Sequence, residues 1–240
     1  MWYNEAFLAP FFLGHYSYAD EIRIIIDHSS DDNTRQICSK YPNVKMEEYT
    51  YPDMYDCQLH VDKVNEVASN LDCDWIIAVD ADELIFPETF EDAGVFLRRQ
   101  KGNLVYAKMW HAYRHRTDVD LDPTKPAIWQ RRHGDPNPQP SAERLYNKPL
   151  IVKPEIGIVW KVGFHLYHEN SIAGVSDEKF IGTHWKMVDV DMAIERRIGG
   201  RKERMSKKNL RMGWSGQDHQ ITEDEIREEC EHHLDDPKIF

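Results

Sequence analysis

The chain has 240 residues, 41% of them hydrophobic, which is enough to bury a full core. Its 42 acidic and 30 basic residues give a formal net charge of -12, which argues against a protein whose main task is to grip nucleic-acid phosphates. The four cysteines are widely spaced and predict neither a zinc knuckle nor a disulfide framework, so we expect a reducing, cytoplasmic compartment. No apolar run approaches the roughly 20 residues that span a bilayer, and we expect no transmembrane segment.

The first 100 residues alternate between helical and strand patterns. Apolar spacing predicts helices over 5–18, from 34 onward and over 58–70, and strands over 22–26, 44–49 and 75–79. Strands that alternate with helices indicate an α/β fold with a mostly parallel central sheet. In such sheets ligands bind outside the carboxyl ends of the strands.

The remainder of the chain has a less regular pattern of predicted elements. A long proline-rich and charged loop is expected over 118–141, where substrate contacts are often found. Short strands are predicted at 104–107, 150–152, 157–162 and 180–182, and helices at 191–205 and from about 222.

The sequence Asp80-Ala81-Asp82-Glu83 follows the apolar run 75–79 directly. Two carboxylates at i and i+2 after a buried strand are costly unless a positive charge lies between them. Mn²⁺ or Mg²⁺ is the natural candidate, because both prefer oxygen ligands and can bridge a protein to a diphosphate. The alternative is a solvated acidic turn that caps the next helix.

Two motifs stand upstream of this turn. Asn4-Glu5 opens a predicted helix, and the polar loop 27–34 (Asp-His-Ser-Ser-Asp-Asp-Asn-Thr) follows the strand 22–26. Together with Asp74-Trp75 and the acidic turn, in this order, they resemble the family 2 glycosyltransferases of GT-A fold. The branch concerned carries N-E…D-x-x-S-x-D-x-T…D-W…D-x-D-E. The resemblance covers residues 4–87 and continues more weakly to about residue 204, and it implies a Rossmann-like GT-A sheet flanked by helices.

The resemblance implies a role for each matched position. Asp27 corresponds to the acid that binds the nucleotide base, and Asp82 to the ligand of a metal bound to the diphosphate. Asp80 corresponds to the acid that lies near the ribose or near the metal. The full set expected to contact the nucleotide-sugar is Asn4, Glu5, Asp27, Ser29, Asp31, Asp80, Ala81 and Trp110. A helix cap alone would also explain loop 27–34, since Ser29 and Asp31 could serve it without a ligand.

Two histidines and two carboxylates complete the expected site. His184 precedes a basic, glycine-containing segment that resembles the part of this branch where a histidine is a further metal ligand, and His165 is the second choice. Otherwise each is an ordinary core histidine. An inverting transfer needs a general base at the acceptor hydroxyl. Glu169, in a His-Glu element, is the candidate, Asp135 is the alternative, and a retaining enzyme would need neither.

The resulting expectation is a single GT-A domain over 1–240. Residues 1–103 would bind the nucleotide-sugar, 104–205 would complete the acceptor and metal side, and 206–240 would form a helical appendage. The activity would be that of an Mn²⁺- or Mg²⁺-dependent, inverting hexosyltransferase. It would move a sugar from a nucleotide-sugar, UDP-sugar favoured, to a glycan, lipid-linked or protein-linked acceptor. The alternative is a catalytically silent nucleotide- or carbohydrate-binding domain. One departure is that only three residues precede Asn4, so the usual first strand is either very short or lost from a fragment.

Overall fold

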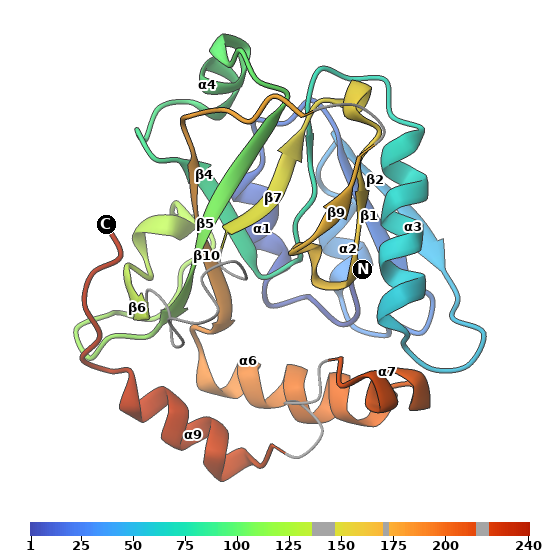
Figure 1. The fold of residues 1–240 in the computed structure, drawn as a ribbon. Helices are drawn as coiled ribbons and strands as arrows, with labels where there is room; N and C mark the ends of the chain where they lie inside the picture. The colour runs from blue at the N-terminus through green and yellow to red at the C-terminus, as the bar shows by residue number, and fades with distance from the viewer. Residues whose placement is uncertain (136–146, 170–172, 215–220) are drawn as a thin grey trace. The chain divides into compact units, whose positions relative to one another are not determined.

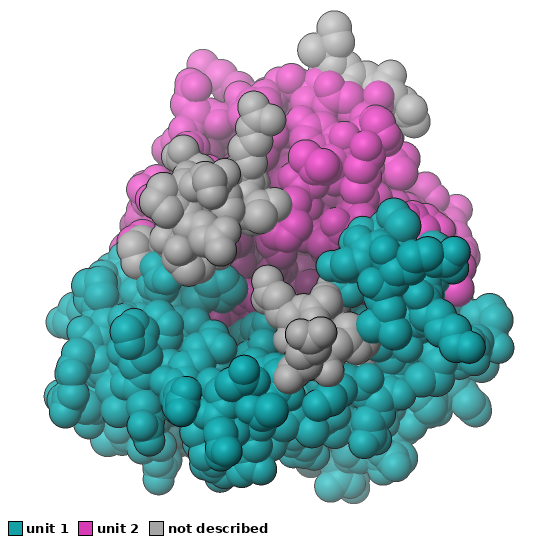
Figure 2. Space-filling view, turned by 60° about the horizontal axis from the view of Figure 1, so that its bottom comes forward, with its two compact units in different colours: residues 1–56, 111–135, 185–240 teal, residues 57–110, 136–184 magenta. Residues whose placement is uncertain are grey.

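The computed structural model describes residues 1–135, 147–169, 173–214 and 221–240. The chain divides into two compact units, each assembled from separate segments (Figure 2). Unit 1 comprises 1–56, 111–135 and 185–240, and unit 2 comprises 57–110 and 136–184. The expected single domain with parts 1–103, 104–205 and 206–240 stays a prediction.

The first half of unit 1 is a strand-helix-strand element. Strands β1 (Ile22–Asp27) and β2 (Val44–Tyr49) pair in parallel, and α2 (Thr34–Cys38) lies between them in the chain. Helix α1 (Ala9–His15) precedes β1 and is shorter than the predicted 5–18. The short first strand is reduced to one parallel bridge from Trp2 to Ile26, in which the Trp2 N–H donates to the Ile25 carbonyl over 2.8 Å.

The second half of unit 1 is mostly helical. The predicted helix 191–205 is divided into α6 (Val190–Ile194), a π-helical stretch (Glu195–Arg201) and a 3₁₀ turn (Lys202–Arg204). The π stretch contains the adjacent glycines 199 and 200, whose weak helix propensity favours such a break in regular geometry. The other described elements of this half are a 3₁₀ turn (Ala127–Trp129), β6 (His133–Asp135), α7 (Lys207–Met212) and α9 (Glu223–His232).

Helix α9 lies beside α6 (Figure 1) and packs on it through a small apolar cluster. The cluster is centred on the buried Tyr113, Met187, Ala193 and Ile226. Helix α9 begins with a capping box, because the Thr222 side chain accepts the Glu225 N–H and the Glu225 side chain accepts the Thr222 N–H. The predicted helix start near 222 is therefore confirmed, with its cap.

Unit 2 is built around a sheet with the strand order β3-β7-β5-β10-β4. The strands are β3 (Ile76–Ile77), β4 (Glu83–Pro87), β5 (Leu104–Tyr113), β7 (Asn147–Val152) and β10 (Phe180–Met187). The last three residues of β5 and of β10 belong to unit 1. The remaining elements of unit 2 are α3 (Cys57–Ser69), α4 (Ala93–Arg99), a β8–β9 pair (Val159–Trp160 with Tyr167–His168) and 3₁₀ turns at Pro154–Ile156 and Val162–Phe164.

The α/β class is as predicted, but the expectation of a mostly parallel, Rossmann-like sheet is wrong, because the sheet is mixed. Strand β4 pairs antiparallel with β10, β7 pairs antiparallel with both β3 and β5, and β6 pairs antiparallel with β5. Only five residues separate β3 from β4, whereas a parallel crossover needs a dozen or more. The apolar run 75–79 yields a strand of two residues, and the chain turns immediately afterwards.

Among the residues that the structure describes, no helix is long and apolar enough to cross a membrane.

Candidate functional site

The acidic segment 80–83 is a tight turn that leads into a strand. The Glu83 N–H donates to the Asp80 carbonyl over 3.0 Å, and Glu83 is already the first residue of β4. Asp82 is 1% exposed and Glu83 is fully buried, with Ala81 buried between Asp80 and Asp82. This is neither a solvated turn nor a helix cap. Two adjacent carboxylates have been withdrawn from water, which requires compensation by positive charge or hydrogen bonds.

Lys148 provides part of that compensation from strand β7. Its Nζ forms a buried salt bridge with Glu83 Oε1, while Glu83 Oε2 accepts the Asp80 N–H over 3.2 Å. Burial disfavours the ammonium, but the charges of Glu83 and Asp80 raise the pKa of Lys148 above its ordinary value. Burial also opposes ionisation of Asp80, yet the positive charges of His60 and Lys148 hold its pKa below the ordinary value. The Asp80 carboxyl is therefore ionised at neutral pH.

His184 lies beside the carboxylate predicted to hold the metal. In the antiparallel pair of β10 and β4 it stands opposite Glu83, and its Nε2 is 3.2 Å from Asp82 Oδ2. Carboxylate and imidazole are both ligands that Mn²⁺ accepts. Within the described ranges there is no group of three or more His, Cys, Asp or Glu side chains that could hold a metal ion. Asp82 and His184 therefore supply two donor side chains of the kind that such ions accept, and a metal ion here stays a prediction.

Asp27, the acid expected at the nucleotide base, is the last residue of β1 in unit 1. Its Oδ1 accepts the Ser29 N–H over 2.9 Å and the Ser29 hydroxyl over 2.6 Å, and its Oδ2 pairs with Arg204 Nη2. The Arg204 guanidinium lies 3.4 Å from the centroid of the Tyr3 ring and also donates to Ser29 Oγ over 3.0 Å. Burial raises the pKa of Asp27, but the Ser29 and Arg204 hydrogen bonds outweigh it and hold that pKa below its ordinary value.

Asn4 ties the N-terminal segment to loop 27–34. Its Oδ1 accepts the Ser30 hydroxyl over 3.0 Å and the Asp31 N–H over 2.9 Å, and its Nδ2 donates to Asp31 Oδ1 over 2.8 Å. Its backbone φ is +51°, a left-handed conformation that asparagine tolerates better than most residues. The N-cap residue of helix α2 is Asn33, which makes no side-chain cap hydrogen bond, so a cap from Ser29 or Asp31 does not explain the loop; Asp32 Oδ1 instead accepts the Thr34 N–H over 2.9 Å. Asn4 therefore positions the loop, with its amide already engaged by protein groups.

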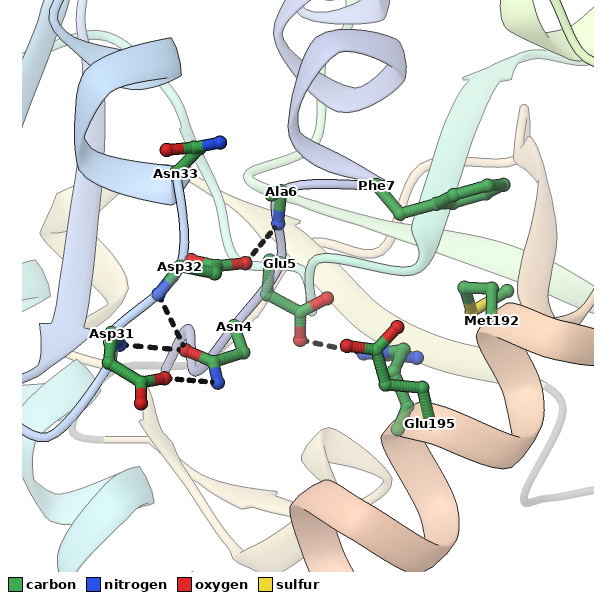
Figure 3. A pocket seen from close by; sticks show the side chains of 10 residues that line it. Asn4, Glu5, Ala6, Phe7, Asp31, Asp32, Asn33, Met192 and Glu195 are labelled. Carbon is green, nitrogen blue, oxygen red and sulfur yellow. Dashed lines mark hydrogen bonds and ion pairs between the residues drawn. The ribbon is translucent and has the colours of Figure 1, made fainter.

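A cavity of about 320 Å³ opens beside Asn4 within unit 1 (Figure 3). Ten residues line it: Asn4, Glu5, Ala6, Phe7, Asp31, Asp32, Asn33, Met192, Glu195 and Arg196. Arg196 donates to Glu5 Oε1 over 2.8 Å, and both side chains are largely buried. The next basic residue, Arg197, pairs with Glu229 on α9, at 3.3 Å. Three of the predicted nucleotide contacts, Asn4, Glu5 and Asp31, thus line one cavity.

The remaining predicted residues are placed as follows. Trp110 is half-buried in β5, with Lys108 Nζ 5.2 Å from its ring centroid. Glu169 is exposed just after β9, and Asp135 ends β6 opposite His111. His165 ends the 3₁₀ turn Val162–Phe164. Their roles stay predictions.

No protein-family model and no curated protein matches the chain. Among solved structures it is similar to crystal structures of S. aureus TarS. TarS 1-349 in complex with UDP is 17% identical with a TM-score of 0.45, covering 75% of this chain and 58% of that one. TarS 1-349 alone is 15% identical with a TM-score of 0.45, covering 82% and 61%, and TarS is 14% identical with a TM-score of 0.44, covering 97% and 42%. The chain thus spans less than two thirds of each, and similarity of this degree does not establish a family.

Reasoning from the sequence missed Lys148 and Arg204, and it placed Arg196 in the basic segment after His184 without predicting that it pairs with Glu5. Each neutralises a buried carboxylate of the expected site. A signal for them existed, since buried carboxylates demand partners. The sequence could not say which of the 30 basic residues would supply them.

Proposed function

We propose that the chain is a glycosyltransferase that moves a hexosyl group from a UDP-sugar or related nucleotide-sugar to an acceptor hydroxyl, with Mn²⁺ or Mg²⁺ bound. The observation that carries the proposal is the buried Asp82 carboxylate with His184 Nε2 3.2 Å away, at the start of β4. The order of the N-E, Asp27-loop and acidic-turn motifs supports it. The acceptor, whether glycan, lipid-linked or protein-linked, is left open by these residues.

In the proposed reaction, the acceptor oxygen attacks the anomeric carbon while the bond from that carbon to the diphosphate oxygen breaks. Asp82 and His184 would hold the cation, which when bound neutralises charge on the departing diphosphate. Asp27 would accept an N–H of the base, and Glu169, or else Asp135, would take the proton of the acceptor hydroxyl. The outcome would be inversion at the anomeric carbon.

A catalytically silent nucleotide- or carbohydrate-binding domain is the second candidate. It is favoured by one specific observation: two of the expected ligand-binding carboxyl clusters already contain a cation of the chain, Arg204 at Asp27 and Lys148 at Glu83. Carboxylates that are already paired with cations of the chain can stabilise a binding domain that has no catalytic activity.

Release of nucleotide from UDP-, GDP- and dTDP-sugars with Mn²⁺ separates the two candidates. We expect release by the wild type and a loss of about a hundredfold or more in Asp82→Ala, because a metal that neutralises the leaving group supplies several kcal/mol at the transition state. Asp72→Ala, which removes an exposed carboxylate of the same unit, is the matched control and should keep full activity. Equal rates of nucleotide release by the wild type and Asp82→Ala, or no release by either, would contradict the proposed glycosyltransferase activity.

A further inference from the structure

The guanidinium of Arg204 covers two groups of unit 1 that a nucleobase would use. It pairs with Asp27 Oδ2, and its Cζ lies 3.4 Å from the centroid of the Tyr3 ring. A base beside an acid donates a ring N–H to the carboxylate and lays its flat face on an aromatic ring. A guanidinium offers the same combination, because it is planar and carries its N–H donors in that plane. Arg204 thus makes the contacts that a base bound at Asp27 would make.

Asp27 cannot serve both partners at once. Its Oδ1 accepts the Ser29 N–H over 2.9 Å and the Ser29 hydroxyl over 2.6 Å, and Arg204 Nη2 donates to its Oδ2. The same Nη2 also donates to Ser29 Oγ over 3.0 Å, so one nitrogen spans both residues. Asp27 is 3% exposed, which leaves few directions from which a second donor can approach. The guanidinium and a base therefore exclude each other at Oδ2 and on the Tyr3 ring.

The backbone of Arg204 is fixed by the segment that precedes α3. The Arg204 carbonyl accepts the Tyr55 N–H over 2.8 Å, and the Ser206 N–H donates to the Tyr55 carbonyl over 3.0 Å. Between these two bonds, Met205 forms a parallel bridge with Tyr55. The Arg204 side chain is 20% exposed, so water lies next to it. Rotation about its side-chain bonds is therefore enough to uncover Asp27 and Tyr3, with no movement of the backbone.

We propose that Arg204 occupies the base subsite of the unliganded protein, and that a nucleotide binds by displacing the guanidinium from Asp27 and Tyr3. This rests on the proposed function, because the ligand is the nucleotide of the sugar donor. Arg204 is then a competitor built into the chain. It lowers the fraction of molecules that are ready to bind, and it raises the apparent Kd of a nucleotide by the inverse of that fraction.

Titration calorimetry with UDP and MnCl₂ measures this competition. Arg204→Ala removes the competitor and keeps Asp27, so we expect the apparent Kd of UDP to fall at least about fivefold, which corresponds to about 1 kcal/mol. Loss of a cation by itself weakens the attraction for an anionic ligand, so the expected direction is opposite to that of a simple charge effect. Arg211→Ala is the matched control: it removes the same side chain from an exposed position of α7, and the Kd should not fall.

A second background tests whether the competition takes place at Asp27. In Asp27→Asn the partner of the guanidinium has lost its charge, so adding Arg204→Ala should change the Kd of UDP by less than about twofold. A tightening as large as in the wild-type background would place the effect of Arg204 elsewhere and would overturn the inference.

An arginine with a purely structural role predicts the reverse sign, because loss of its contacts loosens the Asp27 loop and weakens binding. A Kd that is unchanged or higher in Arg204→Ala therefore overturns this inference and leaves the proposed function standing. Should Arg204→Ala fail to fold, Arg204→Lys decides, since it keeps the charge without the planar fork and should still tighten binding at least about twofold. Tighter UDP binding in the variant without nucleotide release from UDP-sugars supports this inference and refutes the transferase, whereas no UDP binding by either protein overturns both.

Discussion

Replacing Arg204 by methionine tests the interpretation of the Asp27 cluster in unit 1. The change removes the guanidinium that pairs with Asp27, donates to Ser29 and stacks on Tyr3, and it keeps a long apolar side chain. A charge-assisted hydrogen bond contributes about 1.5–3 kcal/mol, and a cation–π contact at a partly exposed site about 0.5–1 kcal/mol. Because the Arg204 side chain is 20% exposed, the loss of stability should lie at the lower end of the range measured when one partner of a buried ion pair is removed. We expect the free energy of unfolding to fall by about 2–4 kcal/mol.

Urea unfolding at pH 7 of the wild type, Arg204→Met, Asp27→Asn and the double variant measures this contribution. The coupling energy should be about 1–3 kcal/mol, since the two side chains are in direct contact. Arg23→Met is the matched control, because Arg23 pairs with Glu21 at an exposed site and should contribute less than about 1 kcal/mol.

The same variants should depend on pH in a direction fixed by Asp27. Its pKa in the folded protein lies below the ordinary value of 3.8, so the ionised carboxylate contributes stability that is fully present well above pH 4. That contribution is lost as the pH falls through the folded-state pKa. The stability difference between wild type and Arg204→Met should therefore shrink between pH 7 and pH 3. A coupling energy near zero, or a difference that does not change with pH, would refute the reasoning.

Two further predictions concern packing and capping. A Cβ at Gly182 would collide with the Met109 sulfur and lie 2.8 Å from Ile85 Cγ2, so Gly182→Ala should destabilise the protein by about 1–3 kcal/mol in urea unfolding. Adding Met109→Ala should recover stability relative to the sum of the two single changes, and strict additivity would contradict the clash. Thr222→Ala removes the N-cap of α9 and should cost about 0.5–2 kcal/mol, with faster amide hydrogen exchange in the first turn of that helix. Unchanged exchange there would argue against the cap.

Local patterns in the sequence predicted local structure well. The β-branched run at 22–26 and the alternating segment 44–49 are strands β1 and β2, and the helical spacing of 58–70 is helix α3 to within one residue at each end. The acidic first turn after Thr222 marks the start of α9. In the helices the decisive interactions join residues fewer than five positions apart, and in the strands the β-branched residues themselves favour extended backbone, so the sequence carries both signals directly.

Sheet direction and the counter-ions of the site could not be obtained in this way. Pairing of β4 with β10 joins residues about a hundred positions apart, and nothing local in Glu83–Pro87 specifies an antiparallel partner. Arg204 lies 177 residues from Asp27, and Lys148 lies 65 residues from Glu83. Such pairs depend on the tertiary fold, whereas the composition shows only that basic residues exist to make them.

The ion pairs Asp27–Arg204, Glu5–Arg196 and Glu83–Lys148 solve one physical problem in the same way. Each takes a carboxylate from a segment that the motifs place at a ligand and joins it to a cation from a distant segment within the same unit. A loop held by such a pair is ordered before a ligand arrives, which lowers the entropy cost of binding. The pair also means that a ligand contacting Asp27 must either displace Arg204 or use it as a further donor. The sign of the effect of Arg204→Met on nucleotide affinity therefore distinguishes these two arrangements: tighter binding indicates displacement, and weaker binding indicates that the guanidinium joins the ligand.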